Sequence, residues 1–219
     1  MSIKGAFLSL VLPIMLFGCA SAPDAPRPER EAAARTPTRA PTLEQDGVYG
    51  FTMSEVVRID SDVRRDYQRA ITLLQGEQTE AGIELLLEVT ERAPEVTIPH
   101  IDLGVAHMRL ERYDEAEAAL RKALTLAPNH PVALNEMGIL LRKTGRFPAA
   151  RESYERALAI HPGFHYALLN LGVLCDLYLA DLSCALENYR AYADIVTDDP
   201  QVTIWIADLS NRLGVEESQ

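Results

Sequence analysis

The sequence predicts an all-α fold built from repeated helix-turn-helix units. Prolines recur at one constant interval, at Pro94, Pro128 and Pro162, and three glycines recur with the same period. Ala, Leu and Glu are plentiful while only 6% of the residues are aromatic, and this composition favours helices. A chain of 219 residues with 47% hydrophobic content is long enough for one sizeable domain with appended segments.

The charge of the chain argues against one class of function. Its formal net charge is −11, and no basic stripe is present. Nucleic-acid binding needs such a stripe to neutralise phosphates, so we expect no nucleic-acid partner. The excess of acidic residues is most simply explained by a solvent-exposed surface.

Residues 1–18 are typical of a secretory signal peptide. Lys4 supplies a short positive start, and an apolar run follows at 5–18. This run contains Pro13 and is too short to span a bilayer comfortably. The segment is therefore excluded from the folded domain.

The end of this run, Leu16-Phe17-Gly18-Cys19, resembles the bacterial lipobox. In that motif the signal is cut before a Cys whose thiol carries diacylglycerol, so the resemblance implies lipidation at Cys19. The alternative is an ordinary signal peptide with an incidental Cys. Burial of acyl chains contributes about 0.8 kcal/mol per CH₂, enough for several chains to hold a protein on a membrane. The Asp that retains such proteins in the inner membrane is missing after Cys19, which by resemblance implies the periplasmic face of the outer membrane.

Residues 19–50 are expected to form a disordered linker that carries the lipid at its start. The segment combines Pro, Ala and charges of both signs with almost no apolar residue. Such a segment cannot offset the entropy lost on ordering, and its prolines favour extended conformations. At about 3.1 Å per residue, it would hold the domain several nanometres from its anchor.

Residues 62–199 resemble the tetratricopeptide repeat, a helix-turn-helix unit of about 34 residues with the pattern W-x₂-L-G-x₂-Y, A-x₃-F and P. Three copies match in phase, the third has one extra residue between its halves, and a weaker copy precedes them. The matching positions are His100, Leu103, Gly104, His107, Ala116, Leu120 and Pro128, then Leu134, Met137, Gly138, Leu141, Ala150, Tyr154 and Pro162, then Leu168, Leu171, Gly172, Cys175, Ala185 and Tyr189, and in the weaker copy Ala70, Leu73, Gly82, Leu86, Val89 and Pro94. The resemblance implies a right-handed superhelical array of about three to four units in residues 51–199.

Small residues in each unit have a physical role. Gly104 and Ala116 should let the two antiparallel helices of one unit approach closely, as should Gly138 with Ala150 and Gly172 with Ala185. Each Pro should end a second helix, because it lacks an N–H and clashes with a continuing helix. One unit cannot bury its apolar face alone, so stacking is obligatory.

Residues 200–215 are expected to form a capping helix. Asp199 is a typical N-cap, Pro200 suits the first turn, and Gly214 is a typical stop. An apolar stripe that includes Trp205 would seal the open end of the array. We interpret Trp205 as part of this packing rather than as a binding residue.

No motif for catalysis or for a cofactor is present. His100 and His107 occupy packing positions of the repeat, and Pro162-Gly163 separates His161 from His165. No acid or Cys completes a metal site at the usual spacing, and no phosphate loop or nucleophile elbow occurs. We therefore expect no enzyme, no metal, no cofactor and no small-molecule substrate.

Cys175 and Cys184 lie on the two arms of the expected third unit. If that unit forms as its neighbours do, their side chains lie where the arms approach closest. An exported protein meets an oxidising compartment, which favours a disulfide. Two free thiols packed as small hydrophobes remain the alternative.

In the family, the first helices of the units line a concave groove that holds a peptide or helix of a protein partner. Carried over to this chain, the groove consists of Ile98, Ile101, Val105, Met108, Arg109, Val132, Asn135, Ile139, Arg142, Lys143, Tyr166, Leu169, Val173, Asp176 and Leu177. Some of these residues must also contact neighbouring helices. Arg109, Arg142 and Lys143 suggest a basic patch that attracts a partner's carboxylates.

These observations predict a lipid-anchored, periplasm-facing scaffold that binds an envelope protein through its repeat groove. It resembles lipoproteins that assist the assembly of pili, secretion channels or energy-coupling complexes. The alternative is a regulator that positions a peptidoglycan-remodelling enzyme. The identity of a crosslinked partner would separate the two hypotheses.

Overall fold

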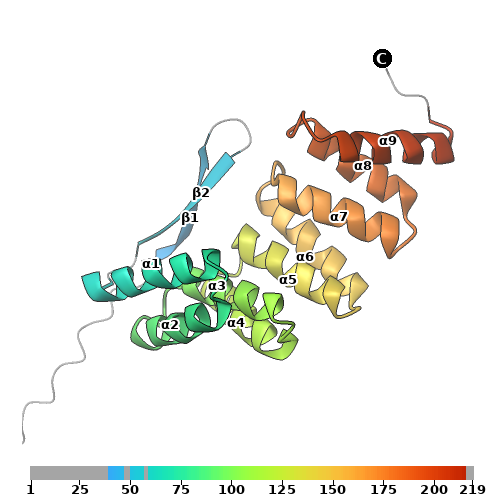
Figure 1. The fold of residues 1–219 in the computed structure, drawn as a ribbon. Helices are drawn as coiled ribbons and strands as arrows, with labels where there is room; N and C mark the ends of the chain where they lie inside the picture. The colour runs from blue at the N-terminus through green and yellow to red at the C-terminus, as the bar shows by residue number, and fades with distance from the viewer. Residues whose placement is uncertain (1–38, 47–49, 57–58, 216–219) are drawn as a thin grey trace, which may run out of the picture. The chain divides into compact units, whose positions relative to one another are not determined.

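The structure is a computed structural model that describes residues 39–46, 50–56 and 59–215. Within these ranges, two strands precede nine helices (Figure 1). The expected signal peptide, the lipidation site Cys19 and most of the expected linker lie outside the described residues. No helix in the described ranges is both long enough and apolar enough to cross a bilayer.

The nine helices form the all-α repeat array that the sequence predicts. Their bounds are α1 Ser61–Gln75, α2 Thr79–Arg92, α3 Thr97–Arg109, α4 Tyr113–Leu126, α5 Pro131–Lys143, α6 Phe147–Ile160, α7 His165–Leu177, α8 Leu182–Ala193 and α9 Pro200–Leu213. The most extensive helix contacts join α1 to α2, α3 to α4, α5 to α6 and α7 to α8, so these are the four helix-turn-helix units. Helix α5 also contacts α3 and α7, which makes the first helices of three units one continuous layer.

Each of these three units closes around a glycine on its first helix. A Cβ atom on Gly138 would lie 2.4 Å from Cε1 of Tyr154, and one on Gly172 would lie 2.5 Å from Cε1 of Tyr189. Gly104 meets the side chain of Leu120 in the same way. The glycine is therefore needed because a large, buried side chain of the second helix packs directly on the backbone. The alanines of the second helix that were predicted to face these glycines are also fully buried, but the direct contact is made by the residue one turn later.

Ion pairs join the second helices of successive units. The guanidinium of Arg112 donates to Glu80 at 2.8 and 2.5 Å, and that of Arg146 donates to Glu117 at 3.0 and 2.7 Å. These groups are partly exposed, so each pair contributes little to the free energy of unfolding. The hydrogen bonds from Arg146, together with those from Arg121, lower the pKa of Glu117 to about 2. The ion pairs lie outside the layer formed by α3, α5 and α7.

A β-hairpin precedes the helices and was not predicted. Strand β1 (Arg39–Asp46) pairs antiparallel with β2 (Gly50–Val56), with Asp46 opposite Gly50. Residues 39–46 fall in the predicted disordered linker, and residues 51–56 fall in the predicted repeat domain. The overlooked signal is Asp46-Gly47 between segments that contain Thr, Leu, Phe and Val, because Asp-Gly is a strong hairpin-turn pair.

Helix α9 caps the array at its C-terminal end. Oδ1 of Asp199 accepts hydrogen bonds from the backbone N–H groups of Gln201 and Val202, at 3.1 and 3.2 Å. Gly214 ends the helix with a φ of 66°, a left-handed conformation that favours glycine. The Trp205 ring lies 5.2 Å from that of Tyr189, measured between centroids, so Trp205 packs against the last repeat.

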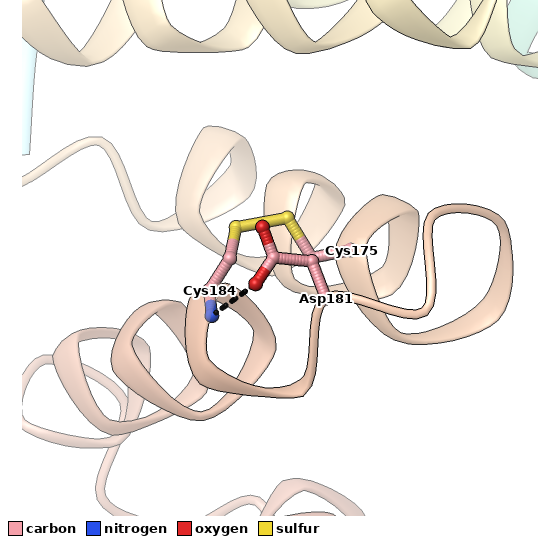
Figure 2. A group of neighbouring side chains, drawn as sticks. All are labelled: Cys175, Asp181 and Cys184. Carbon is pink, nitrogen blue, oxygen red and sulfur yellow. Dashed lines mark hydrogen bonds between the residues drawn. A yellow bond between two sulfur atoms is a disulfide. The ribbon is translucent and has the colours of Figure 1, made fainter.

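A disulfide joins α7 to the start of α8. It links Cys175 to Cys184, whose Cα atoms are 5.9 Å apart (Figure 2). Asp181 lies beside it, and its Oδ1 accepts a hydrogen bond from the backbone N–H of Cys184 at 3.2 Å. Oδ2 of Asp181 accepts from Arg151 of α6 at 2.7 Å. The connection between α7 and α8 is therefore held by the disulfide, by the Asp181 cap of α8 and by the ion pair of Asp181 with Arg151.

Candidate functional site

The layer of first helices carries a groove with a volume of about 690 Å³. Helices α3, α5 and α7 supply most of its lining, and the hairpin supplies one side chain. The lining residues are Met53, Ile98, Ile101, Asp102, His130, Val132, Asn135, Glu136, Ile139, Phe164, His165, Tyr166 and Asn170. The accessible surface of the groove is mainly apolar. We refer to these thirteen residues as the groove.

Six of the residues predicted from the family line this groove. They are Ile98, Ile101, Val132, Asn135, Ile139 and Tyr166. Tyr166 is the most accessible of them, with 59% of its surface exposed. By contrast, Met108 is buried, and Val105, Leu169 and Val173 are partly buried against the core. The structure therefore brings part of the predicted face together in the groove and uses Val105, Met108, Leu169 and Val173 for packing, whereas Leu177 is 68% exposed outside the groove.

The predicted basic residues do not line the groove. Nη1 of Arg109 donates a hydrogen bond to the backbone carbonyl of Leu74 at 3.2 Å. The guanidinium of Arg142 lies over the ring of Tyr178, with its Cζ 5.8 Å from the ring centroid. Lys143 is exposed at the C-terminal end of α5. Arg109 and Arg142 therefore make contacts between units, Lys143 faces solvent, and all three lie outside the groove.

The charged side chains in the groove are instead acidic. Asp102 of α3 and Glu136 of α5 both line it, and they occupy the same position in successive repeats. Burial raises the pKa of each carboxyl group, and the charge of Asp102 further raises that of Glu136. Oδ2 of Asp102 accepts a hydrogen bond from the Tyr67 hydroxyl at 2.7 Å. Each ionised carboxylate is thus partly desolvated and would be stabilised by an opposite charge.

Two amides extend this polar line. Asn170 of α7 stands one further repeat length beyond Glu136, and its Nδ2 donates to Oδ1 of Asn135 at 3.1 Å. Nδ2 of Asn135 in turn donates to Oε1 of Glu136 at 3.1 Å. These two consecutive hydrogen bonds orient the Glu136 carboxylate and hold both amide side chains in place. Asn135 is among the residues predicted from the family, whereas Asp102, Glu136 and Asn170 are not, and their shared spacing of one repeat length is the sequence signal that could have found them.

His130 adds a buried donor to the same groove. It is 2% exposed, and its Nδ1 accepts a hydrogen bond from the backbone N–H of Ala133 at 3.3 Å. Burial lowers the pKa of His130 to about 4, so the ring is neutral at pH 7. Because Nδ1 is the acceptor, the proton resides on Nε2. This N–H has no hydrogen-bond partner within the described part of the chain.

The hairpin reaches one edge of the groove through β2. The side chain of Met53 lines the groove, and Glu55 binds the start of α3. Oε2 of Glu55 accepts from the backbone N–H of Thr97 at 2.9 Å, and Oε1 accepts from the Thr97 hydroxyl at 2.7 Å. A carboxylate at a helix N-terminus is favourable because it satisfies free N–H groups and complements the helix dipole.

The arrangement suits recognition of a peptide better than metal chemistry. Among the described residues, one group of side chains has the spacing of metal ligands: Cys175, Asp181 and Cys184. Its two sulfur atoms are bonded to each other, so they do not offer thiolates. The groove offers apolar surface, two oriented carboxylates and a free N–H, which are contacts for a side chain and a backbone.

Comparisons with known proteins agree with the repeat architecture. Two family profiles, both described as tetratricopeptide repeat, match residues 95–163 and 135–200. No curated protein sequence matches the chain at a significant level.

Several solved structures share the fold. The structure of Pseudomonas aeruginosa PilF is 23% identical and superposes with a TM-score of 0.64, over 69% of each chain. MamA from Desulfovibrio magneticus is 20% identical with a TM-score of 0.63, over 72% of this chain and 88% of its own. A thermophilic TPR protein of Thermus thermophilus is 20% identical with a TM-score of 0.60, over 68% and 81%. At this level of identity the similarity concerns the fold alone.

Proposed function

We propose that the protein, whose residues 95–200 match profiles of the tetratricopeptide repeat, is a lipid-anchored adaptor that faces the periplasm. In this proposal it binds a protein of the cell envelope during assembly of a pilus, secretion or energy-coupling complex. A helical repeat scaffold of this type is suited to protein–protein interaction, and such scaffolds generally have no catalytic role.

The observation that carries the proposal is the groove across three first helices. It is continuous because α5 contacts both α3 and α7. Its apolar lining, with Tyr166 at 59% exposure, offers surface that a partner would remove from water. Such burial contributes roughly 25 cal/mol per Å² before the entropic cost of association.

Two features of the chain support export and anchoring. The segment Leu16-Phe17-Gly18-Cys19 resembles the lipobox at the end of an apolar run. The Cys175–Cys184 disulfide is typical of an oxidising compartment such as the bacterial periplasm. The absence of Asp directly after Cys19 favours the outer membrane over the inner one.

The anchor gives a direct prediction. With Cys19→Ser, we expect the protein to move from the membrane fraction to the soluble fraction, because the thiol that carries diacylglycerol is gone. Fractionation followed by immunoblotting measures the shift, and circular dichroism of the released protein checks that the helices remain. Matched control substitutions are Ser21→Ala and Ala20→Ser. If Cys19→Ser sediments with membranes as before, lipidation at Cys19 is wrong.

The groove gives a second prediction. A photo-crosslinking amino acid at Tyr166 should trap one dominant envelope protein in intact membranes, because this side chain is exposed within the groove. The same amino acid at Leu87 of α2, which is 46% exposed outside the groove, should not trap that protein. Mass spectrometry identifies the adduct. A pilus or secretion component supports the proposal, a wall hydrolase supports the regulator hypothesis, and equal capture at both positions contradicts binding in the groove.

A further inference from the structure

The polar residues of the groove form an ordered line. Asp102, Glu136 and Asn170 occupy the same position in three successive repeats, because each is separated from the next by one repeat length. All three line the groove. A ligand along the groove would therefore meet two carboxylates in succession and then a carboxamide. The line is directional, with its negative charge on the α3 and α5 side.

The two carboxylates accept hydrogen bonds from neutral side chains. Tyr67 donates to Asp102, and Asn135 donates to Glu136. Arg109 lowers the pKa of Asp102 through its charge, but burial outweighs this effect, and the Arg109 guanidinium donates to the Leu74 carbonyl. Partly desolvated anions that hydrogen bond only to neutral donors are stabilised strongly when a cation binds.

A second, independent group in the groove points to a peptide backbone. His130 is 2% exposed, and its Nε2–H has no acceptor in the part of the chain that the structure describes. An unsatisfied buried donor costs free energy that a hydrogen bond recovers. A backbone carbonyl oxygen is an acceptor of the right kind. A metal ion is disfavoured, because the described residues place no third His, Cys, Asp or Glu ligand close to Asp102 and Glu136.

We propose that the groove binds a peptide segment of a protein partner that carries a Lys or Arg side chain between apolar residues. The cationic group lies against Asp102 and Glu136, and a carbonyl of the segment accepts from His130. The apolar flanks contact Ile139 and Tyr166. This inference rests on the proposed function, because it assumes that the groove is the binding surface, and it adds the chemistry of the bound segment. It replaces the expectation that a basic patch attracts carboxylates.

The test uses a phage-displayed library of random dodecapeptides, selected on the full-length protein with its disulfide intact. We expect the selected peptides to share one Lys or Arg between apolar residues. The double variant Asp102→Asn, Glu136→Gln should bind such a peptide at least about tenfold more weakly, equivalent to about 1.4 kcal/mol. The matched control is Glu88→Gln with Asp198→Asn, two exposed carboxylates outside the groove that give the same change in charge, and its affinity should stay within about twofold.

A second measurement does not depend on folding of the variants. Replacing the basic residue of the selected peptide with Gln should weaken binding to the unaltered protein by the same factor. It should change binding to the double variant little, because the contact is already lost.

The outcomes separate the inference from the proposed function. Selection of neutral or acidic peptides whose binding is abolished by Tyr166→Asp would overturn the inference and leave the groove as the binding surface. Selection of no peptide, or of peptides that Tyr166→Asp does not affect, would overturn both. Self-association that depends on Asp102 and Glu136, without peptide binding, would assign the groove to a second copy of this chain and would also overturn the inference.

Discussion

Replacing Tyr154 with alanine should lower the free energy of unfolding by about 3–5 kcal/mol, the usual range for removing a fully buried aromatic ring. Tyr154 has no exposed surface, and its ring fills the space against the Gly138 backbone at the centre of the α5–α6 unit. The unit lies between two others, so a cavity there weakens both neighbouring interfaces. Thermal and urea denaturation monitored by circular dichroism measure the loss.

Two controls separate the ring from the hydroxyl group. Tyr154→Phe keeps the ring and should change stability by at most about 1 kcal/mol, since it removes only a buried hydroxyl that has no hydrogen-bond partner among the described residues. Tyr166→Ala removes a ring of the same size from a site that is 59% exposed and should change stability by less than about 1 kcal/mol. Equal losses for Tyr154→Ala and Tyr166→Ala would contradict the packing described for Tyr154.

The repeat architecture could be predicted from the sequence because its constraints recur within each repeat unit. Gly138 and Tyr154 belong to one unit, so the same small-against-large contact reappears at Gly172 with Tyr189 and marks the period. The capping helix was likewise predicted from local signals, since Asp199 and Gly214 act through the backbone of their own helix. Packing within a unit and capping of a helix depend on residues that are close in the sequence, so both could be predicted from it.

The charge of the groove could not be predicted in the same way. Ile101 and Asp102 are adjacent on α3, about 100° apart around the helix, and both line the groove. How far the groove extends around each first helix depends on how neighbouring units stack, which no single unit specifies. Arg142 illustrates the consequence, because its guanidinium reaches the Tyr178 ring of the next unit instead of the groove.

Replacing Gly138 with leucine should lower the free energy of unfolding by about 3 kcal/mol or more. Overpacking a core typically costs about 1–3 kcal/mol, and we expect this site to lie at or above the upper end of that range. A Cβ at this position would lie 2.4 and 2.6 Å from two ring carbons of Tyr154, and that ring is fully buried and cannot swing into solvent. Gly138→Ala adds the Cβ atom alone and so tests its contact with the Tyr154 ring. Gly163→Ala is its matched control, because a Cβ there meets its nearest atom at an ordinary 3.7 Å and should change stability little.

The decisive variant combines Gly138→Leu with Tyr154→Ala. The first substitution overfills the space at the centre of the α5–α6 unit, and the second empties it, so each relieves the defect that the other creates. Contacting residues couple by about 0.5–3 kcal/mol, and we expect the double variant to be more stable than the sum of the two single losses by an amount in that range. Urea denaturation of the four proteins completes the cycle. Additive losses would mean that the Gly138 backbone and the Tyr154 ring do not share one space, and the description of the repeat interior would then be wrong.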